Sequence, residues 1–286
     1  MAGEEPDAKR EPGAHRSLGS FAALILAGRR GPHDALAEER GVSHRALLPV
    51  AGVPMLLRVL RALRISPSVG DICLSIDSAE PLAGVPELAA DLAEGRLALH
   101  HSLDSPSRSV AHALGELGAR PVLVTTADHA LLTSEIVEHF VAAARVSDAD
   151  AVVGVVARSV LKAAYPDSPR TYVPLRGEAW SGANLFAFRT PRARRAAEFW
   201  VRAERHRKQP WRLLAAVGPG AAARFALGRL DLDAACQQLS RACGCRVQAV
   251  PLPFPEAAID VDHAADVELA TRILKTRERS EAPTGS

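Results

Sequence analysis

Short apolar runs alternate with helical patterns along the first half of the chain. The apolar runs have the length and composition of buried strands, and they cover residues 21–28, 71–77, 96–101, 120–128 and 150–157. The segments between them have helical spacing, at residues 53–64, 86–95, 109–118 and 133–146. Parallel neighbouring strands need right-handed crossover connections, so the series predicts a mainly parallel sheet with helices on both faces. Ligands of such a three-layer α/β/α domain bind beyond the carboxyl ends of the strands.

The second half is less regular and predicts additions to this sheet. Residues 171–178 and 182–189 have the pattern of a further strand pair, and we expect the complete sheet to be mixed. A helical insert is predicted over residues 191–241, with Gly-Pro-Gly at 218–220 as a break. Residues 245–252 are expected to return to the sheet, and residues 263–278 to form a closing helix capped by Asp262.

The length of 286 residues suits one large α/β domain or two small ones, and we favour one, over residues 21–277. Residues 1–20 are polar and lack the apolar core of a signal peptide, so we expect a disordered leader there and a disordered tail over residues 278–286. No apolar run is long enough to span a bilayer. Four cysteines do not form a disulfide framework at this length, which favours a cytoplasmic location.

Composition narrows the function little. Hydrophobic residues make up 48% and charged residues 24%, which is ordinary for a globular protein, and the formal charge of +2 does not indicate a class of partner. Cys236, Cys243 and Cys245 cluster, but they lack a fourth ligand and a C-x-x-C knuckle. We therefore interpret them as thiols rather than zinc ligands.

The loop after the first strand has the features of an anion site. Gly28 lets the backbone turn sharply and Gly31 permits a second unusual torsion, so that freed amides can point into the space above the strand. Positive charge around the loop comes from Arg29, Arg30, His33 and Arg45. A polyphosphate fits such a loop, although the pattern is neither a Walker loop nor the dinucleotide fingerprint. The alternative is a surface loop with ordinary turn glycines.

The wider context resembles a known family. "LILAGRRG" and "SHRALLPVAGVPML" are similar to the signature of nucleotidyltransferases of the MobA-like and sugar-phosphate kinds, L-A-G-G-x-G-x-R followed by K-x-L-L-P-V-x-G-x-P-M-L. The matching residues are Leu26, Ala27, Gly28, Gly31, Leu47, Leu48, Pro49, Val50, Gly52, Pro54, Met55 and Leu56. Segments 123–133, 181–191 and 259–270 follow in the family's order, so the resemblance spans residues 22–275 and implies a GT-A/Rossmann-like fold.

This chain departs from the family's pattern at several positions, and the usual loop arginine is not in register. Arg29 replaces the second glycine of the signature, Arg45 replaces its lysine, and Ala130 replaces a proline. An arginine keeps the positive charge and can grip phosphate oxygens through two N–H groups, but it lacks the compact charge of lysine.

The resemblance implies roles for particular residues. The triphosphate would be held by Gly28, Arg29, Gly31 and Arg45, and Leu26 and Ala27 would also belong to the nucleotide-binding segment. The base and ribose would be held by Ser107 and Ser109, and the acceptor by Gly182 and Asn184, although Asn184 could bind the ribose instead. Mg²⁺ would be held by Asp128 and Asp260, or by Asp262 in place of the latter. Arg45 and Asp128 would be the catalytic residues.

Each of these roles has a structural alternative. Asp128 ends a strand that points at the ligand crevice, but an aspartate there can also cap the following helix, for which Thr133 or Ser134 is better placed. Either Ser107 or Ser109 is expected to cap its own helix. Asn184 could simply be an inward polar residue at a strand edge.

The implied activity is the transfer of a nucleotidyl group from an NTP to a phosphorylated small-molecule or lipid-linked acceptor, with release of pyrophosphate. CTP and GTP are the favoured NTPs. A phosphate monoester is already an anion and needs no general base, so catalysis rests on positioning and on cations such as Mg²⁺ that spread the developing charge. The alternative is a nucleotide-binding or regulatory module without turnover, motivated by Arg29 and Arg45.

A basic segment over residues 188–214 suggests further partners. It contains the aromatic residues Phe199, Trp200 and Trp211 and the cationic residues Arg189, Arg192, Arg194, Arg195, Arg202, Arg205, Arg207, Lys208 and Arg212. Peripheral contact with an anionic membrane and binding of an acceptor phosphate are two hypotheses, and a solvated face whose aromatics pack on the sheet is the third. We expect no nucleic-acid partner, because aromatic residues make up only 4% of the chain and no nucleic-acid-reading motif accompanies the charge.

Overall fold

The computed structural model describes residues 20–281 apart from residues 30, 32 and 205–217. Within this part the chain forms an eight-stranded sheet with the order β10-β7-β9-β6-β1-β4-β5, and β8 pairs with β9. The strands are β1 (Phe21–Leu26), β4 (Val69–Ile76), β5 (Leu97–His101), β6 (Val122–Thr126), β7 (Ala151–Ala157), β8 (Val173–Leu175), β9 (Glu178–Phe188) and β10 (Val247–Pro251). β9 runs antiparallel to both β6 and β7, whereas the other pairings along the path are parallel, which confirms a mainly parallel, mixed sheet.

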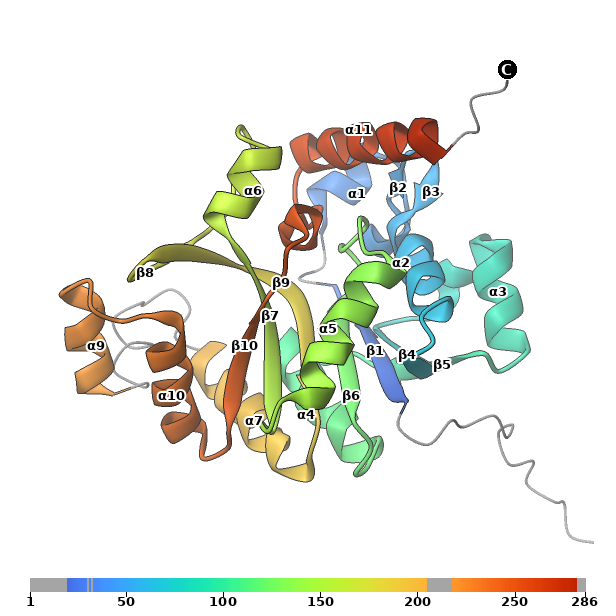
Figure 1. Ribbon diagram of the computed structural model, residues 1–286. Helices are drawn as coiled ribbons and strands as arrows, with labels where there is room; N and C mark the ends of the chain where they lie inside the picture. Colours follow the sequence, from blue (N-terminus) through green and yellow to red (C-terminus); the bar gives the residue numbers. More distant parts are fainter. Residues whose placement is uncertain (1–19, 30, 32, 205–217, 282–286) are drawn as a thin grey trace, which may run out of the picture.

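Helices cover both faces of the sheet (Figure 1). They are α1 (Ala35–Glu39), α2 (Met55–Arg64), α3 (Pro86–Ala93), α4 (Pro106–Glu116), α5 (Ser134–Val146), α6 (Arg158–Ala164), α7 (Arg194–Glu204), α9 (Pro219–Ala226), α10 (Leu232–Cys243) and α11 (Ala264–Glu281). Short 3₁₀ turns lie at η1 (Arg45–Leu47), η2 (Glu80–Gly84), η3 (Pro191–Ala193) and η4 (Pro255–Ala258), and β2 (Pro49–Val50) forms a hairpin with β3 (Val53–Pro54).

Alternation of side chains along the strands separates two cores. Ile25 and Leu123 point to the face covered by α2, α3 and α5. Leu24 and Val124 point to the opposite face, where they pack with α4, α7 and the end of α10. Burial on both faces explains why the central strands are continuous apolar runs.

The observed strands and helices confirm most of those predicted from the sequence, but their first and last residues differ from the predicted ones. α1 and α6 are helices within stretches to which the sequence pattern assigned no element, and the first residues of the predicted 53–64 helix form β3 instead. The predicted helical insert contains η3, α7, α9 and α10, and Gly218 has a φ of 114° at the break. α11 continues to Glu281, into the expected tail, whereas the expected leader lies outside the described residues except for Ser20.

The prediction that Asp262 caps the closing helix is wrong. The carboxylate of Asp266, inside the first turn of α11, accepts hydrogen bonds from the backbone N–H groups of Asp262 (3.1 Å) and His263 (2.9 Å). Asp266 thus satisfies these two N–H groups from within the helix, and the side chain of Asp262 lies beside Arg45.

Candidate active site

A pocket of about 660 Å³ opens at the carboxyl edge of the sheet, above β1, β4, β5 and β6. Its walls come from both layers of helices, so the pocket crosses the edge of the sheet from the α1 and η1 side to the α4 and α7 side. Its lining residues are Leu26, Ala27, Gly28, Arg29, Asp34, His44, Arg45, Ala46, Met55, Ser75, Leu103, Asp104, Ser105, Pro106, Arg108, Ser109, Thr126, Ala127, Asp128, Val201 and Glu204.

The loop after β1 is packed tightly against the end of β5. A Cβ at position 28 would lie 2.8 Å from Oγ and 2.9 Å from Cβ of Ser102, so only glycine fits. Gly31 is exposed, lies outside the pocket lining, and would meet nothing within 4 Å if it carried a Cβ. The structure therefore places Gly28, but not Gly31, at the pocket. Arg30 lies outside the described residues.

Gly28 supports a prediction about packing. We expect Gly28→Ala to lower the free energy of unfolding by about 1–3 kcal/mol, because the added methyl group overlaps Ser102. Urea denaturation measures the change. Adding Ser102→Gly to this variant should recover most of the loss, and Gly31→Ala should shift stability by less than about 0.5 kcal/mol. A Gly28→Ala protein as stable as the wild type would contradict the packing argument.

Arg29 is folded back over the loop. Its Nη2 donates to the carbonyl of Ser43 (2.9 Å), and its Nε lies 3.2 Å from Oδ2 of Asp77. Asp77 also contacts Nε2 of the buried His44 at 3.0 Å. Burial opposes ionisation of Asp77, but the hydrogen bond from His44 and the charge of Arg29 together lower the pKa of its carboxyl. Arg29 thus carries its positive charge at the rim, 42% exposed, in a fixed orientation.

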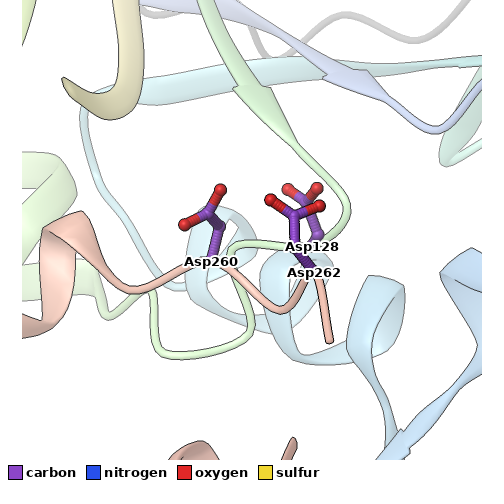
Figure 2. Close-up of side chains that lie close together, drawn as sticks. All are labelled: Asp128, Asp260 and Asp262. Atoms are coloured by element: carbon purple, nitrogen blue, oxygen red, sulfur yellow. The ribbon is translucent and has the colours of Figure 1, made fainter. Parts of the chain in front are cut away.

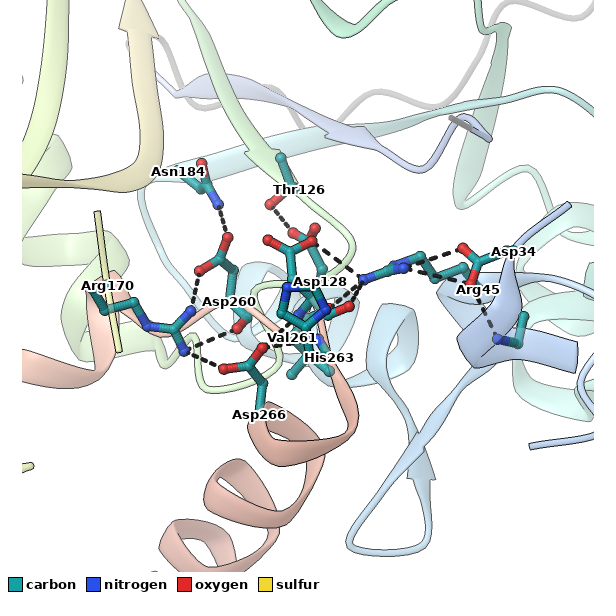
Figure 3. Close-up of polar contacts among 12 residues, drawn as sticks. Asp34, Arg45, Thr126, Asp128, Arg170, Asn184, Asp260, Val261, His263 and Asp266 are labelled. Atoms are coloured by element: carbon teal, nitrogen blue, oxygen red, sulfur yellow. Dashed lines mark hydrogen bonds and ion pairs between the residues drawn. The ribbon is translucent and has the colours of Figure 1, made fainter. Parts of the chain in front are cut away.

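Arg45 joins distant parts of the chain at the other side of the pocket (Figure 3). Its Nη1 lies 3.2 Å from Oδ2 of Asp34, the N-cap residue of α1. Its Nη2 donates to the carbonyls of Asp262 (2.7 Å) and Val261 (2.9 Å) and lies 3.2 Å from Oδ1 of Asp262. The guanidinium makes several hydrogen bonds in diverging directions, which a lysine could not make from a single nitrogen.

Three carboxylates meet beside this arginine (Figure 2). Asp128 follows β6, Asp260 and Asp262 lie just before α11, and one carboxylate oxygen from each lies within 4.8 Å of the others. The backbone N–H of Val261 donates to the carbonyl of Asp128 (3.0 Å), which ties the two segments together. Asp128 does not cap α5, because Thr133 does, and its carboxylate instead accepts a hydrogen bond from Oγ1 of Thr126.

The cluster has the chemistry of a site for a hard cation. Oxygen donors from carboxylates are what Mg²⁺ prefers. Burial raises the pKa of Asp260 to about 6, and the negative charge of Asp128 adds to this rise. A divalent cation would relieve that repulsion, so the donor set fits one.

Two side chains that donate hydrogen bonds hold Asp260. Nη1 of Arg170 lies 3.0 Å from its Oδ1, and Nη2 of Arg170 lies 2.8 Å from Oδ1 of Asp266. The side chain of Arg170 is only 9% exposed. Arg170 could not be predicted from the sequence, because it lies in a loop between α6 and β8 that carries no motif. It is 90 positions away from Asp260 in the sequence, and only the fold brings the two side chains together.

Asn184 contacts the second carboxylate oxygen of Asp260. Its Nδ2 is 3.5 Å from Oδ2, and its φ of 47° is left-handed, at a register shift in the pairing of β9 with β7. A β-bulge re-aims side chains, and asparagine tolerates this conformation better than most residues. Gly182 is exposed in β9 beside the bulge, and neither residue lines the main pocket.

The prediction that Ser107 or Ser109 caps its helix is wrong. The N-cap of α4 is Ser105, which accepts from the N–H of Arg108 (3.4 Å), and Pro106 occupies the first helical position. Serine before proline was the signal for this cap. Ser109 lines the pocket and donates to the carbonyl of Ser105 (3.0 Å), whereas Ser107 is buried and donates to Glu204 of α7.

The described part of the basic segment packs on the domain. Arg189 donates to the carbonyl of Ala149 (2.6 Å), Arg195 donates to that of Gly244 (2.9 Å), and the rings of Trp200 and Phe186 are 5.4 Å apart. These contacts agree with the packing hypothesis. Trp211 lies outside the described residues, with Arg205, Arg207, Lys208 and Arg212. No helix in the described ranges is long and apolar enough to cross a membrane.

Solved structures with the same fold are GT-A-like nucleotidyltransferases. The chain itself belongs to the family of the MobA-like NTP transferase domain, whose model matches residues 23–215. Asp128 lies inside this match, whereas Asp260 and Asp262 lie beyond it and join the site only through the fold.

Three solved structures show how similar this chain is to known proteins in sequence and in fold. A hypothetical transferase from Thermus thermophilus is 29% identical, with a TM-score of 0.70, over 87% of this chain and 99% of that one. CMP:2-keto-3-deoxy-manno-octonic acid synthetase complexed with CTP is 14% identical, with a TM-score of 0.54, over 90% and 100%. The 4-diphosphocytidyl-2C-methyl-D-erythritol synthase from Anaerococcus prevotii is 13% identical, with a TM-score of 0.53, over 90% and 97%. No curated protein matches the chain significantly in sequence.

Proposed function

We propose that this protein is a Mg²⁺-dependent nucleotidyltransferase that uses CTP or GTP and a phosphorylated small-molecule or lipid-linked acceptor, and releases pyrophosphate. The observation that carries the proposal is the contact between the nucleotide-sized pocket and the acidic cluster, through Asp128, which belongs to both. CTP is bound in one structure of the same fold, and another is named for a diphosphocytidyl product. The free thiols Cys243 and Cys245 accord with a cytoplasmic location.

The chain's own residues would hold the substrates in line for transfer. Gly28, Arg29 and Arg45 line the pocket and would hold the triphosphate, the two arginines through their positive charge. Asp128, Asp260 and Asp262 would hold Mg²⁺, which when bound supplies positive charge to the phosphate oxygens. Asn184, which contacts Asp260, and Gly182 of the same strand β9 would bind the acceptor. Since this acceptor is already an anion, the site needs no general base.

Pyrophosphate release tests the proposal directly. The assay contains Mg²⁺, each of the four NTPs in turn, and pools of phosphorylated metabolites or of lipid phosphates. We expect release with one NTP and one pool, and none with Asp128→Ala. Absence of release from every combination, with an NTP still raising the melting temperature, would favour the binding module without turnover.

The Arg45→Lys variant distinguishes a nucleotidyltransferase from a nucleotide-binding module without turnover. A lysine restores the residue that the family's signature carries at this position, so an enzyme should retain or gain activity. The lost contacts to Asp34 and Asp262 should cost about 1 kcal/mol of stability in a urea titration. If the protein only binds nucleotides, neither version releases pyrophosphate.

A further inference from the structure

The helical insert of residues 191–241 reaches the pocket through the last turn of α7. Val201 and Glu204 line the pocket there, opposite the wall that contains Asp34 and Arg45. α7 packs beside α4, and the two helices lie together behind the sheet (Figure 1). This end of the pocket is therefore built by two helices, one of which belongs to the insert.

Glu204 is held in a defined orientation. Its Oε2 accepts a hydrogen bond from Oγ of Ser107, a side chain with no exposed surface. Among the residues that the structure describes, Oε1 has no hydrogen-bond or ion-pair partner. Val201, Leu103 and Pro106 line the same end of the pocket and supply apolar surface. A carboxylate beside an apolar wall fits a flat ligand whose edge donates hydrogen bonds.

A second polar group in the pocket also lacks a partner. Oγ of Ser75, at the end of β4, is buried and unpaired within the described part of the chain, and Ser75 lines the pocket. This hydroxyl is covered by its neighbours, so the carboxylate of Glu204 is the group at this end of the pocket that a ligand can reach.

Guanine matches the carboxylate best among the four bases. Its N1–H and N2–H groups are adjacent donors, and a carboxylate accepts two such hydrogen bonds side by side. Adenine and cytosine each present one donor next to a ring nitrogen acceptor, which a carboxylate repels. Uracil presents one donor between two carbonyls. We propose that Glu204 selects a guanine nucleotide, so that GTP is the nucleotidyl donor. This inference rests on the proposed function and narrows its choice of NTP.

Calorimetric titration in the presence of Mg²⁺ tests the proposal without requiring turnover. Each of the four NTPs is titrated into wild-type protein, into Glu204→Gln and into Glu198→Gln. Glu198 is the matched control, because it also lies on α7 and does not line the main pocket. We expect the wild type to bind GTP at least about tenfold more tightly than the other NTPs, as expected for hydrogen bonds to a charged acceptor.

Glu204→Gln should lose about tenfold in affinity for GTP and change less than about threefold for CTP, whereas Glu198→Gln should match the wild type. Ser107→Ala, which frees Glu204 from its hydrogen bond, should weaken GTP binding in the same direction. Tighter binding of CTP, or unchanged GTP binding by Glu204→Gln, would overturn the guanine inference and leave the nucleotidyltransferase proposal standing. Absence of binding by every NTP would overturn both.

Discussion

Replacing Asp128 by asparagine is expected to lower the rate of pyrophosphate release by about 10²–10³-fold while the fold remains intact. Asparagine has the shape of aspartate, and the backbone carbonyl at this position still accepts the hydrogen bond from Val261. What disappears is one negative charge from a cluster in which Asp128 and Asp260 repel each other. The melting temperature measured without metal should therefore stay the same or rise, and its increase on adding Mg²⁺ should shrink.

Asp104→Asn is the matched control for this prediction. Asp104 also lines the pocket, but its carboxylate is 68% exposed, pairs with Arg108 at 2.7 Å and lies outside the acidic cluster. We expect its rate to stay within about threefold of the wild type. An Asp128→Asn enzyme that keeps more than about a tenth of the wild-type rate would remove Asp128 from the proposed metal site.

Arg170→Ala is expected to lower the free energy of unfolding by about 3–5 kcal/mol, because it leaves two carboxylates without their counter-charge. The guanidinium bridges Asp260 and Asp266, and its side chain is 9% exposed. Urea denaturation without divalent ions measures the loss. Mg²⁺ should restore part of it, because a cation bound near Asp260 replaces some of the missing positive charge.

Arg176→Ala provides the comparison at the surface. Arg176 pairs with Asp231 at 3.1 Å, but its side chain is 66% exposed, so its loss should cost less than about 1 kcal/mol. If Arg170→Ala costs no more than Arg176→Ala, the buried pair does not stabilise this part of the fold, and Arg170 has no positioning role toward Asp260.

The sequence predicts best those strands whose side chains are buried on both faces of the sheet. All six residues of β1 are buried, so the strand is a continuous apolar run that needs no alignment to recognise. α1 was missed because its five residues lie in a polar stretch and only Leu36 and Ala37 are buried. Its start depends on Asp34, which caps the helix and also pairs with Arg45, and such a double contact has no periodic signal.

The residues of the candidate site also divide into those that the sequence predicted and those that it did not. Gly28, Arg45 and Asp128 were predicted as site residues from short motifs next to strands, and the structure brings them to one pocket. Arg170 and Glu204 were missed because their partners, Asp260 and Ser107, are 90 and 97 positions away along the chain. Their identity as charged residues is visible in the sequence, but a long-range contact is a property of the fold alone.

The hydrogen bond between Val261 and Asp128 has a consequence for the order of events during synthesis. The loop after β1 and the strand before Asp128 leave the ribosome early, whereas residues 260–262 leave only near the end. A nascent chain therefore contains the loop after β1 and Asp128 long before it contains Asp260 and Asp262, the other two carboxylates of the proposed metal site. Premature release would yield a chain with Asp128 but without Asp260 and Asp262, so the acidic cluster forms only when nearly the whole chain has been made.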